Sequence, residues 1–273
     1  MVGLELTMLR VLKSVAFVTY KEWAAYRSHM AVSLFVGPVL FLVQLFIWQA
    51  VFSTRETVGG LTLEQMLAYY GIIAVINYAV FDFADWNLQM LIRTGKFLTF
   101  LLRPVSHRWF ALSQKAGHRI LGFWLELVPV ALILHFGFQV DLMPAYPVWA
   151  AVSAALSFLM MFLVNYCIGL TAFWLTNAHG IRGMFHLLRD VSAGVFLPLT
   201  FLPDVLQKAL FVLPFQFIVY VPARVFIGSY ELGGIAMSIP QIVGLQAVAV
   251  CFMWLVSEML WRLGIKRFTG VGA

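Results

Sequence analysis

Charged residues are scarce in this 273-residue sequence: they make up only 11% of it, whereas 62% of the residues are hydrophobic. A soluble globular domain carries about 25% charged residues, which keep its surface in contact with water. The shortage therefore excludes an ordinary soluble protein and predicts a protein embedded in a membrane. Cysteine is scarce too. Because Cys167 and Cys251 lie far apart inside apolar runs, we expect two small buried side chains and no disulfide framework.

Motifs of the common catalytic and nucleotide-binding sites are missing as well. The chain has no G-x-x-x-x-G-K-[ST], H-E-x-x-H or G-x-S-x-G pattern. Its paired histidines, His107 with His118 and His179 with His186, favour solvated or interfacial positions over a metal. We therefore expect no catalytic residue, no metal site and no cofactor bound by this chain, and no nucleic-acid partner.

The first 30 residues lack the uninterrupted apolar core and the cleavage site of a signal peptide. Their apolar side chains recur at near-helical spacing between charged ones. This pattern predicts an amphipathic helix over residues 1–30 that lies at the membrane surface.

Long apolar stretches follow, and a helix needs about 20 mostly apolar residues to cross a bilayer. We expect an all-α membrane protein with six such spans, forming a single transmembrane domain over residues 1–273. The Gly37-Pro38 pair predicts a kink in the first span. The expected spans are 31–52, 66–86, 119–139, 148–175, 184–203 and 240–262.

The segment 204–239 is apolar enough to enter lipid, but prolines divide it into pieces that are too short to span. Non-helical backbone at membrane depth must have its polar groups satisfied by protein or by a water-filled cavity. We therefore expect a re-entrant hairpin of two short, half-buried helices, broken at Pro214 and Pro222, that enters and returns on one side.

Lysine and arginine concentrate on one side of this arrangement. Fifteen of the 18 lie with the two termini, the 87–118 loop and the loop after the fourth span. Cytoplasmic segments carry such an excess of basic residues. Both termini and the 87–118 loop are therefore expected in the cytoplasm, and the 204–239 hairpin on the external side.

Six ionisable side chains fall within or beside the expected spans, where an unpaired charge costs about 2.5–3.5 kcal/mol or more. For the two aspartates near the end of the second span, we favour salt bridges to the basic loop over a proton relay. Arg189 and Asp190 are expected to neutralise each other. Glu126 is expected to pair with a base from the same side, and Glu258 with Arg262, four residues on. The six residues are Asp82, Asp85, Glu126, Arg189, Asp190 and Glu258.

The 87–118 loop contains an apolar stretch surrounded by positive charge. In GKFLTFLLRPVSHRW, residues 95–109, the side chains of Phe97, Phe100 and Leu101 would form one apolar helix face. Pro104 would end this helix. An apolar centre with a charged rim is how protein interfaces are built, so the face predicts docking of a partner. The alternative is a helix resting on anionic lipid.

Three stretches make the chain similar to a known family. They are LLRPVS at 101–106, LPFQFIVYVPARVFIG at 213–228 and GIKRFTGVGA at 264–273. Together with six spans, an N-terminal helix and a broken external hairpin, they resemble the membrane subunit of a type-2 ABC exporter of bacteria. The resemblance implies a multi-pass permease of the bacterial inner (cytoplasmic) membrane that works by alternating access.

The resemblance also implies partners and residue roles. Such a permease would pair with a second six-span permease, identical or paralogous, and with an ABC ATPase dimer that binds ATP and Mg²⁺. The 87–118 loop would carry the coupling helix that docks into the ATPase. Its residues would be Lys96, Phe97, Phe100, Leu101, Arg103 and Pro104. The hairpin would form an external lid with Pro214, Pro222 and Arg224, the arginine holding it through an acid or a carbonyl.

Two functions of other classes stay open at this point. A proton-coupled secondary transporter would need a chain of buried acids, and an inverted repeat would place broken spans in both halves of the chain. Only the second half contains such a broken segment. A membrane scaffold or assembly factor would need neither a pathway nor an ATPase.

Overall fold

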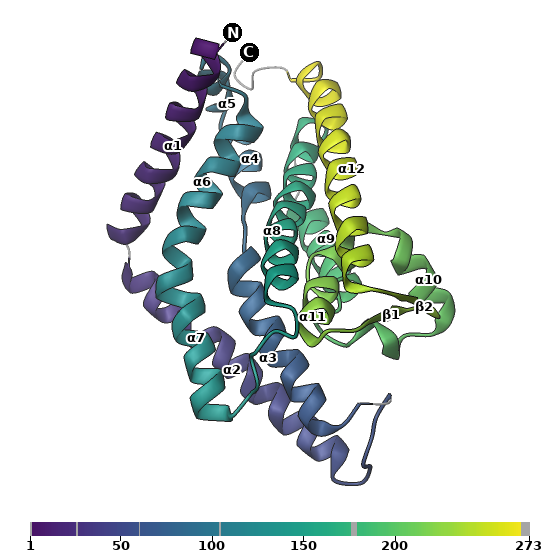
Figure 1. Ribbon diagram of the computed structural model, residues 1–273. Coiled ribbons are helices and arrows are strands. Elements are labelled where there is room, and N and C mark those ends of the chain that lie inside the picture. Colours follow the sequence, from purple (N-terminus) through teal and green to yellow (C-terminus); the bar gives the residue numbers. More distant parts are fainter. Residues whose placement is uncertain (1, 26, 60, 104, 176–178, 269–273) are drawn as a thin grey trace.

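The computed structural model describes residues 2–25, 27–59, 61–103, 105–175 and 179–268. Helices dominate these ranges, and their only strands form one two-stranded antiparallel hairpin. The start of α1 (Val2–Ala25), the short helix α5 (Phe97–Leu101) and the end of α12 (Ile239–Ile265) lie at one end of the molecule, away from the strands (Figure 1). The expected all-α membrane fold is confirmed.

Five helical stretches in the described ranges are long and apolar enough to cross a membrane. They are Val32–Phe52, Leu63–Arg93, His107–Gly137, Pro147–Phe173 and Ile239–Ile265. The first belongs to α2 (Arg27–Phe52), and the second joins α3 (Leu63–Val80) to α4 (Ala84–Arg93). The third consists of α6 (His107–Gly122), η1 (Phe123–Leu127), α7 (Val128–Leu132) and η2 (Ile133–Gly137), and the fourth of α8 (Pro147–Leu170) and η3 (Thr171–Phe173).

The expected fifth span, 184–203, is not one continuous helix. The helix in this region, α9 (His179–Ser192), has 14 residues. At 1.5 Å per residue it is about 21 Å long, shorter than a hydrocarbon layer of about 30 Å. It ends just before Gly194, whose φ of +80° is a left-handed conformation, and the chain continues through Pro198 into the 3-10 turn η4 (Leu199–Phe201). Hydropathy did not show this break, because the residues after it are just as apolar.

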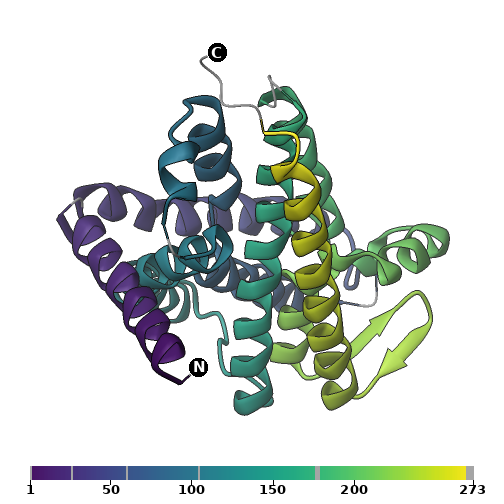
Figure 2. The same ribbon diagram turned by 90° about the horizontal axis from the view of Figure 1, so that it is seen from above.

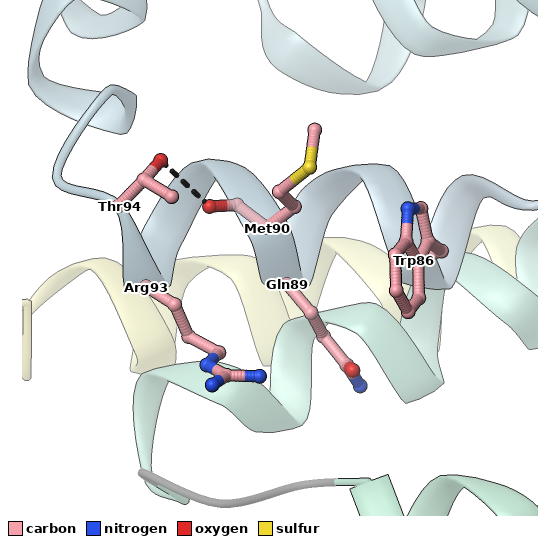
Figure 3. A pocket seen from close by; sticks show the side chains of 5 residues that line it. All are labelled: Trp86, Gln89, Met90, Arg93 and Thr94. Carbon is pink, nitrogen blue, oxygen red and sulfur yellow. Dashed lines mark hydrogen bonds between the residues drawn. The ribbon is translucent and has the colours of Figure 1, made fainter.

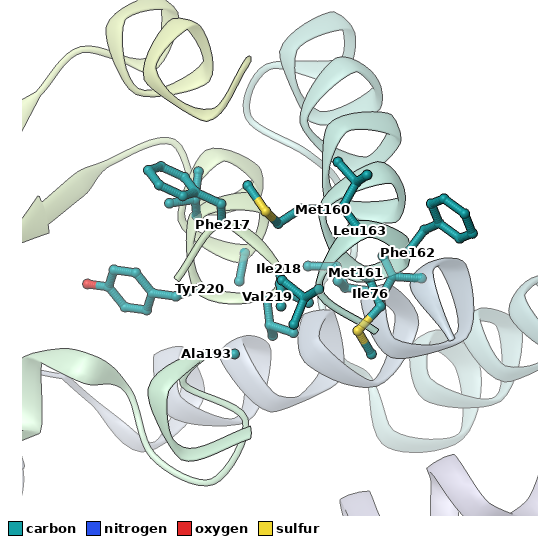
Figure 4. Close-up of a cluster of buried hydrophobic side chains, with 14 of the residues drawn as sticks. Ile76, Met160, Met161, Phe162, Leu163, Ala193, Phe217, Ile218, Val219 and Tyr220 are labelled. Atoms are coloured by element: carbon teal, nitrogen blue, oxygen red, sulfur yellow. The ribbon is translucent and has the colours of Figure 1, made fainter. Parts of the chain in front are cut away.

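The core is built around α8, which packs against α3, α4, α11 (Tyr220–Ile227) and α12. Figure 4 shows Met160 and Leu163 of this helix beside Ile76 of α3 and the Phe217–Val219 segment. All of these side chains are buried. The apolar faces of these helices and the residues around Phe217–Val219 together form one continuous hydrophobic cluster.

Two short helices lie in the segment that was expected to form the re-entrant hairpin; that it enters the membrane and returns stays a prediction. α10 (Asp204–Val212) follows Pro203, and Pro214 opens the 3-10 turn η5 (Pro214–Phe217) that precedes α11. Proline is favoured at the start of a helix, because the backbone N–H that it lacks has no partner within the helix there. The sequence did not predict what comes next, a β-hairpin of β1 (Tyr230–Leu232) and β2 (Ile235–Met237).

The expected N-terminal helix is present as α1, and it packs along α6 (Figure 1). Gly117 of α6 lies against the backbone carbonyl of Ala16, where a side chain would not fit. Near the end of α1 the ring of Trp23 packs on that of His118, with centroids 4.1 Å apart. Viewed from above in Figure 2, α1 and the β-hairpin lie on opposite sides of the molecule. That α1 lies at the membrane surface stays a prediction.

We expect Gly117→Leu to separate α1 from α6, because the new side chain would overlap the Ala16 backbone. Overpacking of this kind costs about 1–3 kcal/mol. The measurement is the thermal unfolding midpoint together with limited proteolysis between α1 and α2. The control is Gly244→Leu in α12, where a side chain would meet open space. Equal protease resistance of the two variants would contradict the close contact.

Candidate functional site

The short helix expected inside the basic loop is present as α5. Gly95 reverses the chain with a φ of +70°, α5 begins at Phe97, and the amide of Arg103 donates to the Phe100 carbonyl just beyond its end. The flanking helices α4 and α6 extend into the loop, so only residues 94–106 lie between them. Pro104 lies outside the described residues.

The expected outward face of this helix is wrong for two of its three residues. Phe97 is fully buried, with ring centroids 5.2–5.8 Å from those of Phe173, Trp261 and Phe268. Phe100 is buried against the ring of His107, 4.7 Å away. Aromatic side chains from η3 and from the end of α12 supply this pocket, and their proximity to the loop could not be read from the sequence.

The outward face is displaced by one residue. Leu98 is 49% exposed, Leu101 42% and Leu102 86%, and they occupy positions i, i+3 and i+4. Lys96 and Arg103 are exposed beside them. The guanidinium of Arg103 lies 5.3 Å from the ring centre of Phe100. We call these five residues the α5 surface; it has an apolar centre and a basic rim.

A hollow of 310 Å³ lies on α4, directly before the turn that leads to α5. Figure 3 shows the side chains that line it: Trp86, Gln89, Met90, Arg93 and Thr94. The Thr94 hydroxyl donates to the Met90 carbonyl at 2.8 Å, which closes the last turn of α4. The apolar part of this hollow is supplied by Trp86 and Met90, both exposed.

Buried ion pairs fix the junction between α3 and α4. Asp82 pairs with Lys115 of α6 at 3.1 Å, and both side chains are almost completely buried. Asp85 pairs with Arg182 and His186 of α9, the histidine at 2.8 Å. The expected salt bridges of these aspartates are thus present, although one of them reaches α9 and not the basic loop.

The other expected charge pairs are also present. Arg189 and Asp190 pair at 2.8 Å, and the same guanidinium donates to the Asn165 side chain of α8. Glu258 accepts from Arg262 at 2.7 Å, four residues on. A second partner of Glu258, Arg108 at 3.1 Å, was not expected because it lies on α6.

Glu126 takes part in a buried network between α2, α3 and α6. It lies in the π-helical turn η1, and Arg119, seven residues earlier, reaches it at 3.4 Å. The Ser33 hydroxyl of α2 donates to its second carboxylate oxygen. Arg119 also donates to the backbone carbonyl of Tyr78 at 2.6 Å. π-helical turns inside α-helices are frequent at functional sites.

The side chain of Tyr78 is inserted into the backbone hydrogen-bond ladder of α2. Its hydroxyl donates to the Ser33 carbonyl at 2.6 Å and accepts from the Gly37 amide at 2.9 Å. These two backbone groups would otherwise bond to each other, and Pro38 removes the next donor of the same ladder. Gly37 has to be a glycine, because a Cβ would lie 2.6 Å from the Tyr78 ring. Insertion into the ladder is a known cause of bends in helices.

A mostly apolar cavity of 370 Å³ opens between α2 and α3 beside this insertion. Its polar side chains are those of Ser33, Gln44, Tyr70, Asn77, Tyr78 and Glu126. Phe196, after the break in α9, closes part of its wall. Cavities of this kind, apolar with a few convergent polar groups, are typical of ligand sites.

The residues expected to form the external lid lie in η5 and α11, and one of them has a different partner from the one expected. Pro214 begins η5 and Pro222 is buried in the first turn of α11. Arg224 was expected to bind an acid or a carbonyl, but its side chain donates to the Ser229 hydroxyl at 3.2 Å. The left-handed Gly228 turns the chain back, which brings Ser229 to the arginine.

The sequence profile described as ABC-2 family transporter protein matches residues 39–272, most of the chain. No curated protein and no solved structure matches it. Within the described residues, no group of three or more His, Cys, Asp or Glu side chains could hold a metal ion.

Fold and site thus define a multi-pass, all-α membrane protein whose charges are paired between helices. The chain belongs to the ABC-2 family of transporter proteins and is a transmembrane permease of the ABC type. Membership of this family implies association with an ABC ATPase.

We expect Asp82→Asn to lower the free energy of unfolding by about 3–5 kcal/mol, because it leaves the Lys115 ammonium buried without its partner. The double variant Asp82→Asn/Lys115→Met should regain most of the loss. Glu258→Gln, at a half-exposed pair, should cost about 1 kcal/mol or less. Unfolding in denaturant measures all three. A double variant as unstable as Asp82→Asn alone would contradict the pairing.

Tyr78→Phe should let the Ser33 carbonyl and the Gly37 amide bond to each other and thereby straighten α2. Nitroxide labels on Val32→Cys and Gln49→Cys, in a background without Cys167 and Cys251, report the length of α2 by electron-spin distance measurement. The label distance should increase. Tyr69→Phe removes the hydroxyl of another tyrosine of α3. It should leave the label distance unchanged, because the Tyr69 hydroxyl bonds to Gly194 and not to α2. Equal distances in all three proteins would exclude a bend maintained by Tyr78.

Proposed function

We propose that this permease is the membrane subunit of an ATP-driven exporter and that the α5 surface is where the ATPase docks. One observation carries the proposal: Leu98, Leu101 and Leu102 are exposed on a helix whose other face is anchored by buried aromatic rings. Exposed leucines with a basic rim fit an apolar groove edged by acidic side chains. ATP and Mg²⁺ would be bound by that ATPase, and this chain would bind no cofactor.

The anchoring explains how a push on α5 would reach the spans. Phe97 contacts η3 and the end of α12, while Phe100 contacts the start of α6. Force on the outward leucines would therefore pass into the third, fourth and last spans through close packing. A loop without these buried rings would bend instead of transmitting the movement.

The cavity between α2 and α3 is the proposed part of the export pathway. Its walls include residues beside the Tyr78 insertion, so a change in the bend of α2 would change its shape. The helix α2 also carries a row of exposed apolar side chains, at Val36, Val39, Leu40 and Val43. A second six-span permease, identical or paralogous, would cover this face and complete the pathway.

The orientation follows from the basic residues. In the proposed arrangement α5 and both termini face the cytoplasm of a bacterial cell. The α10–α11 hairpin lies on the external side of the inner membrane and closes the path as a lid. Membrane lipid would surround the remaining apolar faces, and the basic rim of α5 would also lie near anionic headgroups.

The double variant Leu98→Asp/Leu102→Asp should fold normally and lose the ATPase. We expect a P-loop ATPase to co-purify with the tagged wild-type protein in mild detergent and to be reduced at least about tenfold with the variant, because two apolar contacts are replaced by charges. The matched control is Val205→Asp/Leu206→Asp on α10. These two aliphatic side chains are also exposed, but they lie on another helix than the α5 surface.

Wild-type protein that purifies without any ATPase would favour a secondary transporter or a scaffold. Undiminished ATPase with the α5 variant would place the docking elsewhere on the permease. Phe97→Ala separates the two roles: it should lower the unfolding midpoint, because it removes a fully buried ring.

A further inference from the structure

A pocket of 230 Å³ lies between the start of α3, residues 198–200 and α11. The pocket lies at the opposite end of the molecule from α5, because the connection from α2 to α3 and the helix α11 line it (Figure 1). Leu61, Tyr69, Pro198 and Tyr220 form its apolar and aromatic walls. The docking proposal does not use this pocket.

Arg224 is the only charged side chain that lines this pocket in the described part of the chain. Its one side-chain partner there is the Ser229 hydroxyl, and its Nε is buried without a hydrogen-bond partner. The ion pairs of the described residues involve other basic groups. A partly buried guanidinium without a carboxylate lacks the partner that normally offsets its desolvation.

The other polar groups of the pocket are suited to a negative ligand. The Gln65 side-chain oxygen accepts the Thr62 amide, so its NH₂ group remains as a donor. Ser229 accepts from Arg224, which leaves its own O–H as a donor, and Thr200 adds a further hydroxyl. No carboxylate lines the pocket in the described ranges to compete with an anion.

The two tyrosines contribute ring faces and no charge. The Tyr69 hydroxyl donates to the Gly194 carbonyl at 2.8 Å, and the Tyr220 hydroxyl to the Glu231 carbonyl at 2.7 Å. Burial raises the pKa of Tyr220 to about 12, so this phenol stays neutral at physiological pH. An aromatic or aliphatic group can therefore lie between these rings while its polar end reaches the arginine.

We propose that this pocket binds the anionic group of an amphiphile: a carboxylate, sulfate or phosphate carried on an aromatic or aliphatic body. Arg224 supplies two parallel N–H donors, the geometry that carboxylate and phosphate oxygens match. The binding rests on the pocket alone. That the amphiphile is exported cargo held at the external side before release rests, in addition, on the proposed function.

The test of binding uses phenyl phosphate, a soluble anion with one ring, and the full-length protein in nanodiscs of phosphatidylcholine. Saturation-transfer NMR measures its affinity, with phenyl glucoside as the uncharged comparison. Wild-type protein should bind phenyl phosphate and not the glucoside. Arg224→Gln should weaken binding at least about tenfold, the loss expected for one charge-assisted pair. Arg224→Lys should retain part of it.

Two further variants keep the result interpretable. Arg55→Gln removes an exposed arginine of the α2–α3 connection, outside the pocket, and should bind like the wild type. Ala68→Leu fills the pocket without changing its charge and should also abolish binding. Equal affinity of the wild-type, Arg224→Gln and Ala68→Leu proteins, or equal binding of the glucoside, overturns the proposal.

The source of the anion is decided by two more measurements. If phosphatidylglycerol in the nanodisc displaces phenyl phosphate and ATP hydrolysis of the ATPase complex is unaffected, the site holds a lipid headgroup. If phenyl phosphate stimulates ATP hydrolysis in the wild type and not in Arg224→Gln, the site holds cargo. If no ATPase co-purifies with the wild-type protein, the proposed function is refuted, whereas the result of the binding test still holds.

Discussion

A bilayer contains no water to solvate polar groups, and this constraint explains most of the side-chain pairs inside the permease. The aspartates at the α3–α4 junction are the clearest case. Asp82 is neutralised from α6 and Asp85 from α9, so two charges that could not stand alone tie three elements together. The same need for partners joins Glu126 to Arg119 and Ser33.

These pairs also restrict how the helices can move. Separating Asp82 from Lys115 would expose two charges to lipid, so α3 and α6 are expected to move together. The bond between Tyr78 and α2 is different, because both backbone groups it holds have each other as an alternative partner. We therefore expect the backbone of α2 around Gly37 to change at a small cost, and the cavity beside it to change shape.

A third consequence concerns the basic loop. Five helical residues are too few to keep a helix in place by themselves. α5 keeps its position because Phe97 and Phe100 enter an aromatic cluster formed by η3, α6 and α12. The leucines between and beyond them are thereby fixed outward, and the docking proposal depends on this division between the two faces.

The sequence by itself determined that this is an all-α membrane protein, which five segments form the long apolar helices of the described ranges, and that Pro203 and Pro214 separate short helical pieces after the fifth expected span. Those features depend on local composition and spacing. It also determined that the charges in the spans need partners, and Glu258 with Arg262 could be assigned because they lie one turn apart. Tertiary structure decided the rest. Which phenylalanine of α5 turns inward, how Asp85 meets α9 and why Arg224 has no acid depend on side chains from distant elements, and spacing along the chain carries no information about those contacts.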